Sequence, residues 1–430
     1  MIPDDSPLGL AHEALRLWAV VVLAGLAVGC VVLACLPVGR ERARRVPAWV
    51  LVGVAALLVR AAVSLVQDGA VFDVLVSYRS IGDRVLHGSD VWSGDTESLA
   101  TYPPPIYAWW AIAALVPDAH PHIFAAVVRA PFWIADAGLA VLLVRLLPGQ
   151  LGVRAGWIYA LSPAVIAVPT LHGQDDPVTD LLLVIGVVML ATHRHEARAG
   201  LVIGLGVAIK QWPVFFLLPL IAAVRRPRIL PFLAAVAAPV LVAYAAYGIT
   251  HPHDAIQGFV DVVTYRPHRE GLGTSLFMPS RANGGVFTAT NIVVTVGAGV
   301  VGALMVRRGW SLVDAVAVDM LLLVGLSPTV SDQYLMWAFP FLLLAGRLRT
   351  AALLGAGLLP AVLSLDMWQQ VNDGTTPDAL LIIATLSCVA AAGWILVGGP
   401  KAAVTAPADQ PRESASSGHR RTRPLPTSHA

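Results

Sequence analysis

The feature that most constrains the fold of this sequence is a series of apolar runs, each close to the length of a membrane-spanning helix. The clearest of these nearly uncharged runs are 17–36, 48–66, 229–249, 286–306 and 378–397. A helix needs about 20 predominantly apolar residues to cross the hydrocarbon core of a bilayer. Charged residues make up only 13% of the chain, against about a quarter in soluble proteins. The sequence therefore predicts an all-α, polytopic integral membrane protein.

The placement of arginines orients these runs with respect to the membrane. Cytoplasmic loops of membrane proteins carry an excess of lysine and arginine. The arginines that assign loops to the cytoplasm are Arg40, Arg42, Arg44 and Arg45, Arg145 and Arg154, Arg194 and Arg198, Arg225, Arg226 and Arg228, Arg307 and Arg308, and Arg347 and Arg349. The segments that then face outward are the acidic N-terminus, 67–125, 170–176, 250–285, 331–334 and 367–377.

Two apolar regions must each consist of two short helices for this arrangement to hold. The region 199–224 is expected to break near Lys210, and the region 312–346 is expected to break near Tyr334. With both breaks the chain has about 13 membrane segments, with the N-terminus outside and the C-terminus inside; unbroken helices would give about 11 and would disturb the charge pattern.

We therefore expect one transmembrane domain over residues 1–400. Within it, 67–125 form a long first extracytoplasmic loop and 250–285 form a second large one. The apolar stretch 106–117 is too short to span the bilayer and is predicted to be an interfacial or re-entrant helix. Residues 401–430 are polar and rich in proline and serine, so they are predicted to form a disordered cytoplasmic tail.

Composition and motif context disfavour several functional classes. The net charge of +2 gives no basis for a nucleic-acid partner. The three cysteines lie in apolar runs and show neither a disulfide framework nor metal-site spacing. A glycine pattern typical of dinucleotide-binding sites, at 297–302, lies inside an apolar run without a preceding strand, and helix packing explains it better.

The first outer loop contains the strongest candidate for a general base, Asp73. It lies in the apolar stretch 70–75 beside a membrane span, and ionisable groups close to hydrocarbon are functional candidates. Partial desolvation favours the neutral form of a carboxyl group and makes the carboxylate a better base. Four further acids of this loop fit an ordinary solvated loop; they are Asp83, Asp90, Asp95 and Glu97.

Charged residues also lie in or beside later spans. Arg129 and Asp136 are two helical turns apart and so share one helix face, where each could clamp neighbouring helices or belong to a site. Lys210 lies at an expected helix break, which favours a polar cavity. A lysine that extends its ammonium group to the membrane surface is the alternative.

Two further outer segments are rich in polar residues. The segment 172–176 reads His-Gly-Gln-Asp-Asp, and its spacing matches no standard metal-ligand set, so no metal is predicted. In the segment 250–285, Arg266 and Arg269 could grip a phosphate, although an ordinary solvated loop explains them equally well.

Taken in chain order, these segments resemble the GT-C glycosyltransferases that use polyprenyl-phosphate sugars. The resemblance is closest to the dolichyl-phosphate-glucose glucosyltransferases and to bacterial mannosyltransferases, and it runs over roughly residues 70–340. The segments that carry it are Asp73 followed by Tyr102-Pro103-Pro104, Arg129 with Ala135-Asp136, His172-Gly173-Gln174-Asp175-Asp176, Lys210-Gln211-Trp212-Pro213, and Ser331-Asp332-Gln333-Tyr334-Leu335-Met336-Trp337. The chain departs from the family at 172–176, which is shorter and ends in two aspartates, and the segment 250–285 matches only loosely.

The resemblance implies a hexosyltransferase of the cytoplasmic (inner) membrane with its active site on the extracytoplasmic side. It would move a hexose, with mannose as the expected sugar, from a polyprenyl-phosphate carrier to a glycolipid or glycan acceptor, with inversion and without a cofactor. Asp73 would be the general base. The residues expected to bind donor phosphate or substrate are Lys210, Gln211, Arg129, Arg266, Arg269, Tyr102, His172, Gln174, Asp175, Gln333 and Tyr334.

Two other functions stay open for a membrane protein of this kind. A flippase or transporter of lipid-linked oligosaccharides typically contains repeated halves with broken helices at the bilayer midplane, whereas the polar groups here lie at the outer rim. An envelope polysaccharide polymerase or ligase also uses an outer loop with arginine and histidine, but would lack the order of Asp73 followed by Tyr102-Pro103-Pro104.

Overall fold

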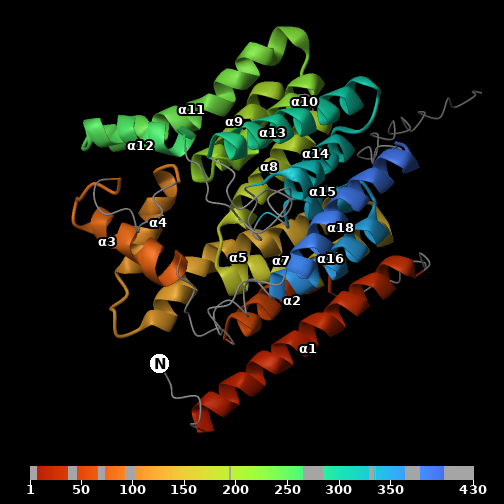
Figure 1. Cartoon of the computed structure of the whole chain (residues 1–430), viewed down its shortest axis with the longest axis horizontal. Coiled ribbons are helices and arrows are strands. Elements are labelled where there is room, and N and C mark those ends of the chain that lie inside the picture. The colour runs from red at the N-terminus through yellow and green to blue at the C-terminus, as the bar shows by residue number, and fades with distance from the viewer. Residues whose placement is uncertain are drawn as a thin grey trace, which may run out of the picture.

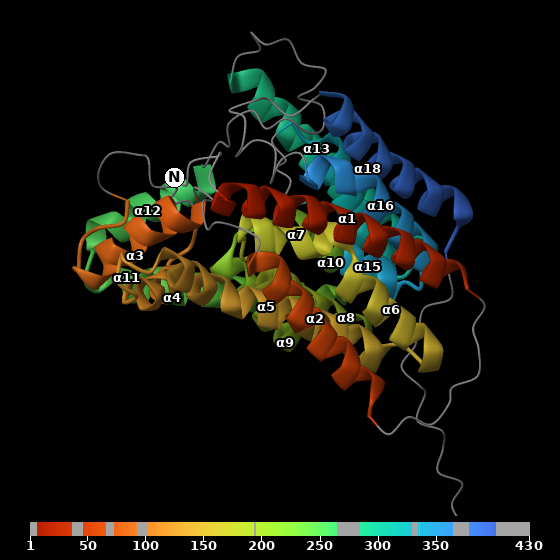
Figure 2. The same ribbon diagram turned by 90° about the horizontal axis from the view of Figure 1, so that it is seen from below.

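The computed structural model describes residues 7–36, 46–65, 73–92, 102–192, 195–264, 284–328, 334, 336–363 and 378–400. Figures 1 and 2 show a bundle of helices packed side by side, and the described ranges contain no β-strand. Helix α1 (Pro7–Cys35) runs along one edge of the bundle, whereas α3 (Arg79–Leu86), α4 (Pro105–Ala114) and α12 (Pro252–Thr264) gather at one end. This architecture confirms the all-α fold expected from the apolar runs.

The remaining elements follow the chain in order. The longer helices are α2 (Ala48–Leu65), α5 (Pro121–Leu146), α6 (Gly149–Leu161), α8 (Asp176–Thr192), α9 (Glu196–Ile209), α11 (Ile229–Gly248), α13 (Gly284–Arg307), α14 (Leu312–Leu326), α16 (Leu348–Leu363) and α18 (Asp378–Gly398). The shorter elements are η1 (Asp73–Tyr78), α7 (Pro163–Ala167), η2 (Val168–His172), η3 (Trp212–Phe216), α10 (Leu217–Ala223), η4 (Arg226–Arg228) and α15 (Ala338–Leu344). One large apolar core, which draws on residues from Leu23 of α1 to Ile395 of α18, joins the bundle.

Among the described residues, three helices are long and apolar enough to cross a membrane. They are Pro121–Leu146, Arg226–Gly248 and Thr288–Arg307. A pair bent by 53°, Gly149–Leu161 and Pro163–Thr170, adds a fourth if it is counted as one span, and shorter apolar helices accompany them. The chain is a polytopic membrane protein, and the total of about 11 to 13 crossings stays a prediction.

Both helix breaks predicted from the charge pattern are present. Helix α9 ends at Ile209, and Lys210 adopts an extended backbone with φ −147° and ψ 128°. The 3-10 turn η3 follows, with Pro213 in its first turn; proline lacks an amide hydrogen and disfavours helical conformation in the residue before it. In the second region α14 ends at Leu326 and α15 begins at Ala338. Backbone and polar groups at such breaks need partners inside the protein.

The segment predicted to be the first outer loop contains a small helical unit with its own apolar core. The core includes Tyr78, Trp110 and Phe124, and the stacked rings of Tyr78 and Trp110 have centroids 4.0 Å apart. Helices α3 and α4 approach closely at Gly82, where an added Cβ atom would lie 2.4 Å from the Trp110 carbonyl oxygen. The helix expected over 106–117 is α4, and its location at the membrane interface stays a prediction.

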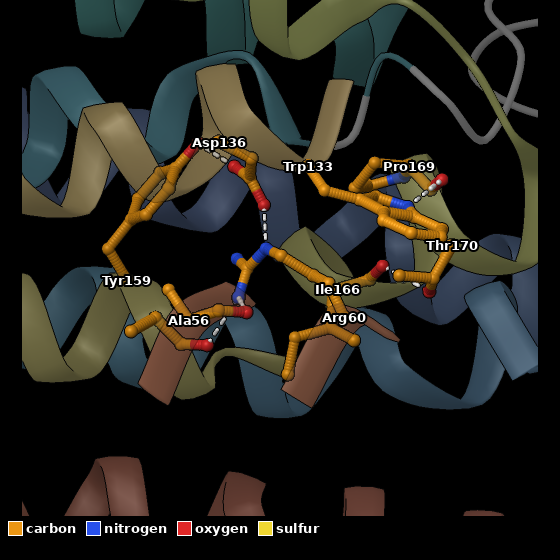
Figure 3. Close-up of polar contacts among 9 residues, drawn as sticks. Ala56, Arg60, Trp133, Asp136, Tyr159, Ile166, Pro169 and Thr170 are labelled. Carbon is orange, nitrogen blue, oxygen red and sulfur yellow. Dashed lines mark hydrogen bonds and ion pairs between the residues drawn. The ribbon is translucent and has the colours of Figure 1, made fainter. Parts of the chain in front are cut away.

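A buried ion pair joins three helices in the core (Figure 3). Asp136 of α5 pairs with Arg60 of α2, and the Tyr159 hydroxyl of α6 donates a hydrogen bond of 2.6 Å to the same carboxylate. Arg60 also donates to the carbonyl oxygen of Ala160 at 2.8 Å, close to the bend between α6 and α7. Asp136 is therefore a clamp between helices, with a partner, Arg60, that the sequence analysis did not identify.

We expect Arg60→Leu to lower the free energy of unfolding by about 3 kcal/mol, because it leaves the Asp136 carboxylate buried without its cation. The double variant Arg60→Leu/Asp136→Leu should recover most of this loss, since an apolar pair of similar volume replaces a buried ion pair at little cost. Reversible unfolding in detergent micelles measures both changes.

The matched control for this cycle is the ion pair between Arg79 and Asp118, with an N–O distance of 2.6 Å. The Asp118 side chain is 91% exposed, and Arg79 also pairs with Asp83, so Asp118→Leu should cost at most about 1 kcal/mol. A double Arg60/Asp136 variant that is no more stable than either single variant would contradict the clamp.

Candidate functional site

Segments that are far apart in the chain meet around the helix break at Lys210. Tyr102 precedes α4, Gln174 to Asp176 connect η2 to α8, and Trp337 precedes α15. We call this set the Lys210 cluster; its members are Tyr102, Gln174, Asp175, Asp176, Lys210 and Trp337. All six side chains are buried. The fold therefore assembles four of the segments that carry the family resemblance into one polar group.

The ammonium group of Lys210 is the centre of this cluster. Its Nζ donates hydrogen bonds to Gln174 Oε1 at 3.0 Å, to Asp175 Oδ1 at 3.0 Å and to Asp176 Oδ2 at 2.8 Å. A lysine ammonium has three N–H donors, so these three acceptors use all of them. One ammonium group therefore serves two carboxyl groups.

Aromatic side chains hold the oxygen atoms of the cluster in place. The Tyr102 hydroxyl donates to Gln174 Oε1 at 3.2 Å, and Lys210 Nζ lies 5.2 Å from the centroid of the Tyr102 ring, within the range of a cation–π interaction. Trp337 Nε1 donates to Asp176 Oδ1 at 2.8 Å. The Trp337 ring stacks on Trp212, with centroids 4.0 Å apart. Fixed rings and short hydrogen bonds preorganise the polar atoms, as a binding or catalytic site requires.

The backbone before α8 can turn into the cluster only because residue 173 is glycine. Gly173 has φ +79°, in the left-handed region. An added Cβ atom would lie 2.5 Å from Val74 Cγ2 and 2.9 Å from Arg129 Nε. On the other side of the turn, Trp133 of α5 holds η2 by donating to the Pro169 carbonyl oxygen at 3.2 Å (Figure 3). The segment 173–176 is thus tied to both η1 and α5.

Two other predicted site residues lie next to this segment. The buried Arg129 side chain faces Gly173, as does Val74 of η1. Val74 directly follows Asp73, the first residue of η1, so the backbone at Asp73 is adjacent to the turn that leads into the Lys210 cluster. The side chains of Asp73 and His172 lie outside the described part of the chain.

The remaining predicted residues divide into two groups. Gln211 follows Lys210 and is half-buried, and the half-buried Tyr334 has its ring centroid 4.3 Å from that of Trp337. Arg266, Arg269 and Gln333 lie outside the described residues. The structure therefore places Tyr102, Gln174, Asp175 and Lys210 in contact, with Gln211, Tyr334 and Arg129 beside them; the roles of all these residues stay predictions.

Three residues with clear structural roles were not predicted from the sequence. Asp176 and Trp337 lie inside the quoted motifs, but sequence spacing does not show which of two adjacent aspartates, or which aromatic ring, turns inward. Arg60 is a lone arginine in an apolar run, and the cost of a charge within the membrane was the signal that could have identified it.

The chemistry available to the cluster follows from its donors and acceptors. Its carboxylate and amide oxygens accept hydrogen bonds from hydroxyl groups, and Asp175 Oδ2 is a buried oxygen for which the described residues provide no hydrogen-bond donor. Within the same described residues, no group of three or more His, Cys, Asp or Glu side chains could hold a metal ion. The arrangement suits a ligand with several hydroxyl groups.

Comparison with known proteins gives one family match. The model of glycosyltransferase family 87 matches residues 100–331, which is more than half of the chain. The match includes Tyr102, the segment 172–176 and Lys210. Neither a curated protein nor a solved structure matches this chain.

Proposed function

The chain belongs to glycosyltransferase family 87, so it is a membrane glycosyltransferase, and from this premise we propose its donor, acceptor and mechanism. The proposed reaction moves a hexose, with mannose as the expected sugar, from a polyprenyl-phosphate carrier to a glycolipid or glycan acceptor. The active site is proposed to face the extracytoplasmic side of the cytoplasmic membrane. The observation that carries the proposal is the convergence of Tyr102, Gln174, Asp175, Lys210 and Trp337, from segments that resemble lipid-carrier-dependent enzymes, on one buried polar cluster.

A lipid-linked donor is the physically reasonable choice for an active site on the extracytoplasmic side of the membrane. Nucleotide sugars are made in the cytoplasm, so a sugar used on the outer side must arrive on a carrier that crosses the membrane. A polyprenyl phosphate keeps its chain in the bilayer and presents its headgroup at the surface. The phosphate is also a good leaving group near neutral pH, which removes the need for a strong general acid.

The proposed step is a single displacement at the anomeric carbon. The acceptor hydroxyl oxygen forms the new glycosidic bond, the bond between the anomeric carbon and the phosphate oxygen breaks, and the bonding electrons leave with polyprenyl phosphate. The hydroxyl proton passes to the Asp73 carboxylate, which acts as general base. One displacement inverts the anomeric configuration.

Cationic groups stabilise the negative charge that develops on the departing phosphate. The proposed contacts are Arg129, Lys210, Arg266 and Arg269. Because both Asp175 and Asp176 already accept hydrogen bonds from Lys210, the phosphate would have to replace one of these acceptors to bind Lys210 directly. His172 and Gln174 are proposed to contact the sugar or the acceptor, together with Tyr102, Gln211, Asp175, Gln333 and Tyr334.

The test begins with mass spectrometry of envelope glycolipids from a strain that lacks the protein, which identifies the species that loses one sugar. Purified protein in proteoliposomes is then given this acceptor and either radiolabelled polyprenyl-phosphate mannose or a nucleotide-activated mannose. We expect covalent transfer from the lipid-linked donor alone. Transfer only from the nucleotide sugar would contradict the proposed donor, and movement of label across the bilayer without covalent transfer would favour a flippase.

A further inference from the structure

Helix α12 has two adjacent apolar sides, and only one of them packs against the rest of the protein. The buried residues recur along one side of the helix; they are Ala255, Gly258 and Val262. On the neighbouring side three apolar residues are exposed; they are Ile256, Phe259 and Val260. At 3.6 residues per turn these two sets lie next to each other, and the exposed Gln257 lies opposite Phe259. Helix α12 is therefore amphipathic, and part of its apolar surface is exposed.

Two aromatic contacts fix the rotation of α12 about its own axis. An added Cβ atom at Gly258 would lie 2.3 Å from Trp92 Cδ2, so the Trp92 ring lies directly against the backbone of the helix. The Phe259 ring has its centroid 5.3 Å from that of Tyr244 on α11. Because both contacts hold the helix, the side that carries Ile256 cannot turn towards the protein.

The exposed apolar side chains of α12 follow directly on those of a membrane span. The span is Arg226–Gly248, and its exposed residues include Leu241 and Val242. Ile249, the first residue after the span, is 84% exposed, and Ile256 is 71% exposed. Exposed apolar side chains thus continue from the span, through the short connection, onto α12.

Lipid is the partner that fits this surface. An amphipathic helix beside the end of a span lies in the interface between headgroups and hydrocarbon, with its apolar side towards the lipid chains. Tryptophan and tyrosine are enriched at this level of a membrane. Here the rings of Trp92 and Tyr247 have centroids 4.9 Å apart, and the Tyr247 hydroxyl donates to Asp90 Oδ1 at 3.3 Å. Since Pro252–Thr264 contains neither lysine nor arginine, apolar contact rather than attraction to anionic headgroups would hold the helix there.

We propose that α12 lies in the membrane interface, with Ile256, Phe259 and Val260 among the lipid chains and Gln257 towards water. The first part of the segment 250–285 is then a membrane-bound helix rather than a solvated loop. Its contact with the indole ring that packs on the apolar core of α3 and α4 holds that helical unit beside the membrane surface. This placement does not depend on the identity of the sugar donor.

The test places a nitroxide spin label on single-cysteine variants in phosphatidylcholine nanodiscs. The variants are Ile256→Cys, Val260→Cys and Gln257→Cys, and Val242→Cys in the span is the control for lipid contact. All of them also carry Cys35→Ala, which removes the exposed native thiol. We expect the labels at 256, 260 and 242 to collide more with oxygen, which concentrates in lipid, than with a water-soluble nickel complex. The label at 257 should show the reverse, and addition of anionic lipid should leave both results unchanged.

Two results would overturn the proposal. Access of the nickel complex to the labels at 256 and 260 that equals its access to the label at 257 would place α12 in water. Low access of both collision partners at 256 and 260 would show that protein covers the apolar side, and spin–spin coupling between molecules would identify that protein as a second copy of the chain. Because the collision measurements need no substrate, their outcome is separate from that of the transfer assay.

Discussion

Replacement of Asp73 by asparagine is expected to lower kcat for sugar transfer by about 10²–10⁴-fold, the range that a positioned general base contributes. Asparagine keeps the size of the side chain but cannot accept the proton of the acceptor hydroxyl. Since the change affects the chemical step, KM for the lipid-linked donor should change little. Steady-state transfer in proteoliposomes measures both constants.

The matched control for this variant is Asp118→Asn. Asp118 belongs to the same predicted outer loop and pairs with Arg79 at 2.6 Å, but its side chain is 91% exposed. An exposed ion pair of this kind contributes little to stability, so the control should transfer sugar at nearly the wild-type rate. Wild-type turnover in folded Asp73→Asn would remove the general-base assignment.

Replacement of Lys210 by methionine is expected to affect both stability and transfer. Methionine has a similar length but leaves the carboxylates of Asp175 and Asp176 buried without their cation. Removal of one partner from a buried ion pair costs about 3–5 kcal/mol, and here one cation serves two carboxylates. Sugar transfer should fall below detection, because the Lys210 cluster loses the ammonium group that holds its three acceptors. Unfolding in detergent micelles and the proteoliposome assay measure the two effects.

A compensated variant separates the role of Lys210 in stability from its role in sugar transfer. Lys210→Met/Asp175→Asn/Asp176→Asn removes all three charges, so most of the lost stability should return while transfer stays undetectable. Lys401→Met, at the other lysine of the chain, is the control for loss of a lysine and should behave as the wild type. Full transfer by the compensated variant would show that Lys210 has only a structural role.

Several parts of the fold could be predicted because they depend on short stretches of chain. The apolar runs predicted the helices, and the arginine pattern required breaks near Lys210 and near Tyr334, both of which the structure contains. A break exposes backbone groups that water cannot reach inside a membrane protein. Polar residues near the breaks were therefore sound candidates before any coordinates were known.

The site was predictable only as a set of segments. The resemblance indicated Tyr102, the segment 172–176, Lys210 and the residues around Tyr334. It treated Lys210 as one of several possible phosphate contacts and did not predict that two carboxylates and an amide would occupy all three of its donors. That arrangement depends on how deeply α8 and α9 lie against each other, which no local pattern records.

The sequence alone determined that this chain is an all-α membrane protein with broken helices, because length, hydropathy, proline and arginine placement act locally. Only the tertiary structure decided which charges meet. Asp136 pairs with Arg60, which is 76 residues away, and Lys210 binds Asp175 and Asp176, which are 35 and 34 residues away. Such pairs depend on the rotation and depth of each helix, and these are set by the packing of the whole core.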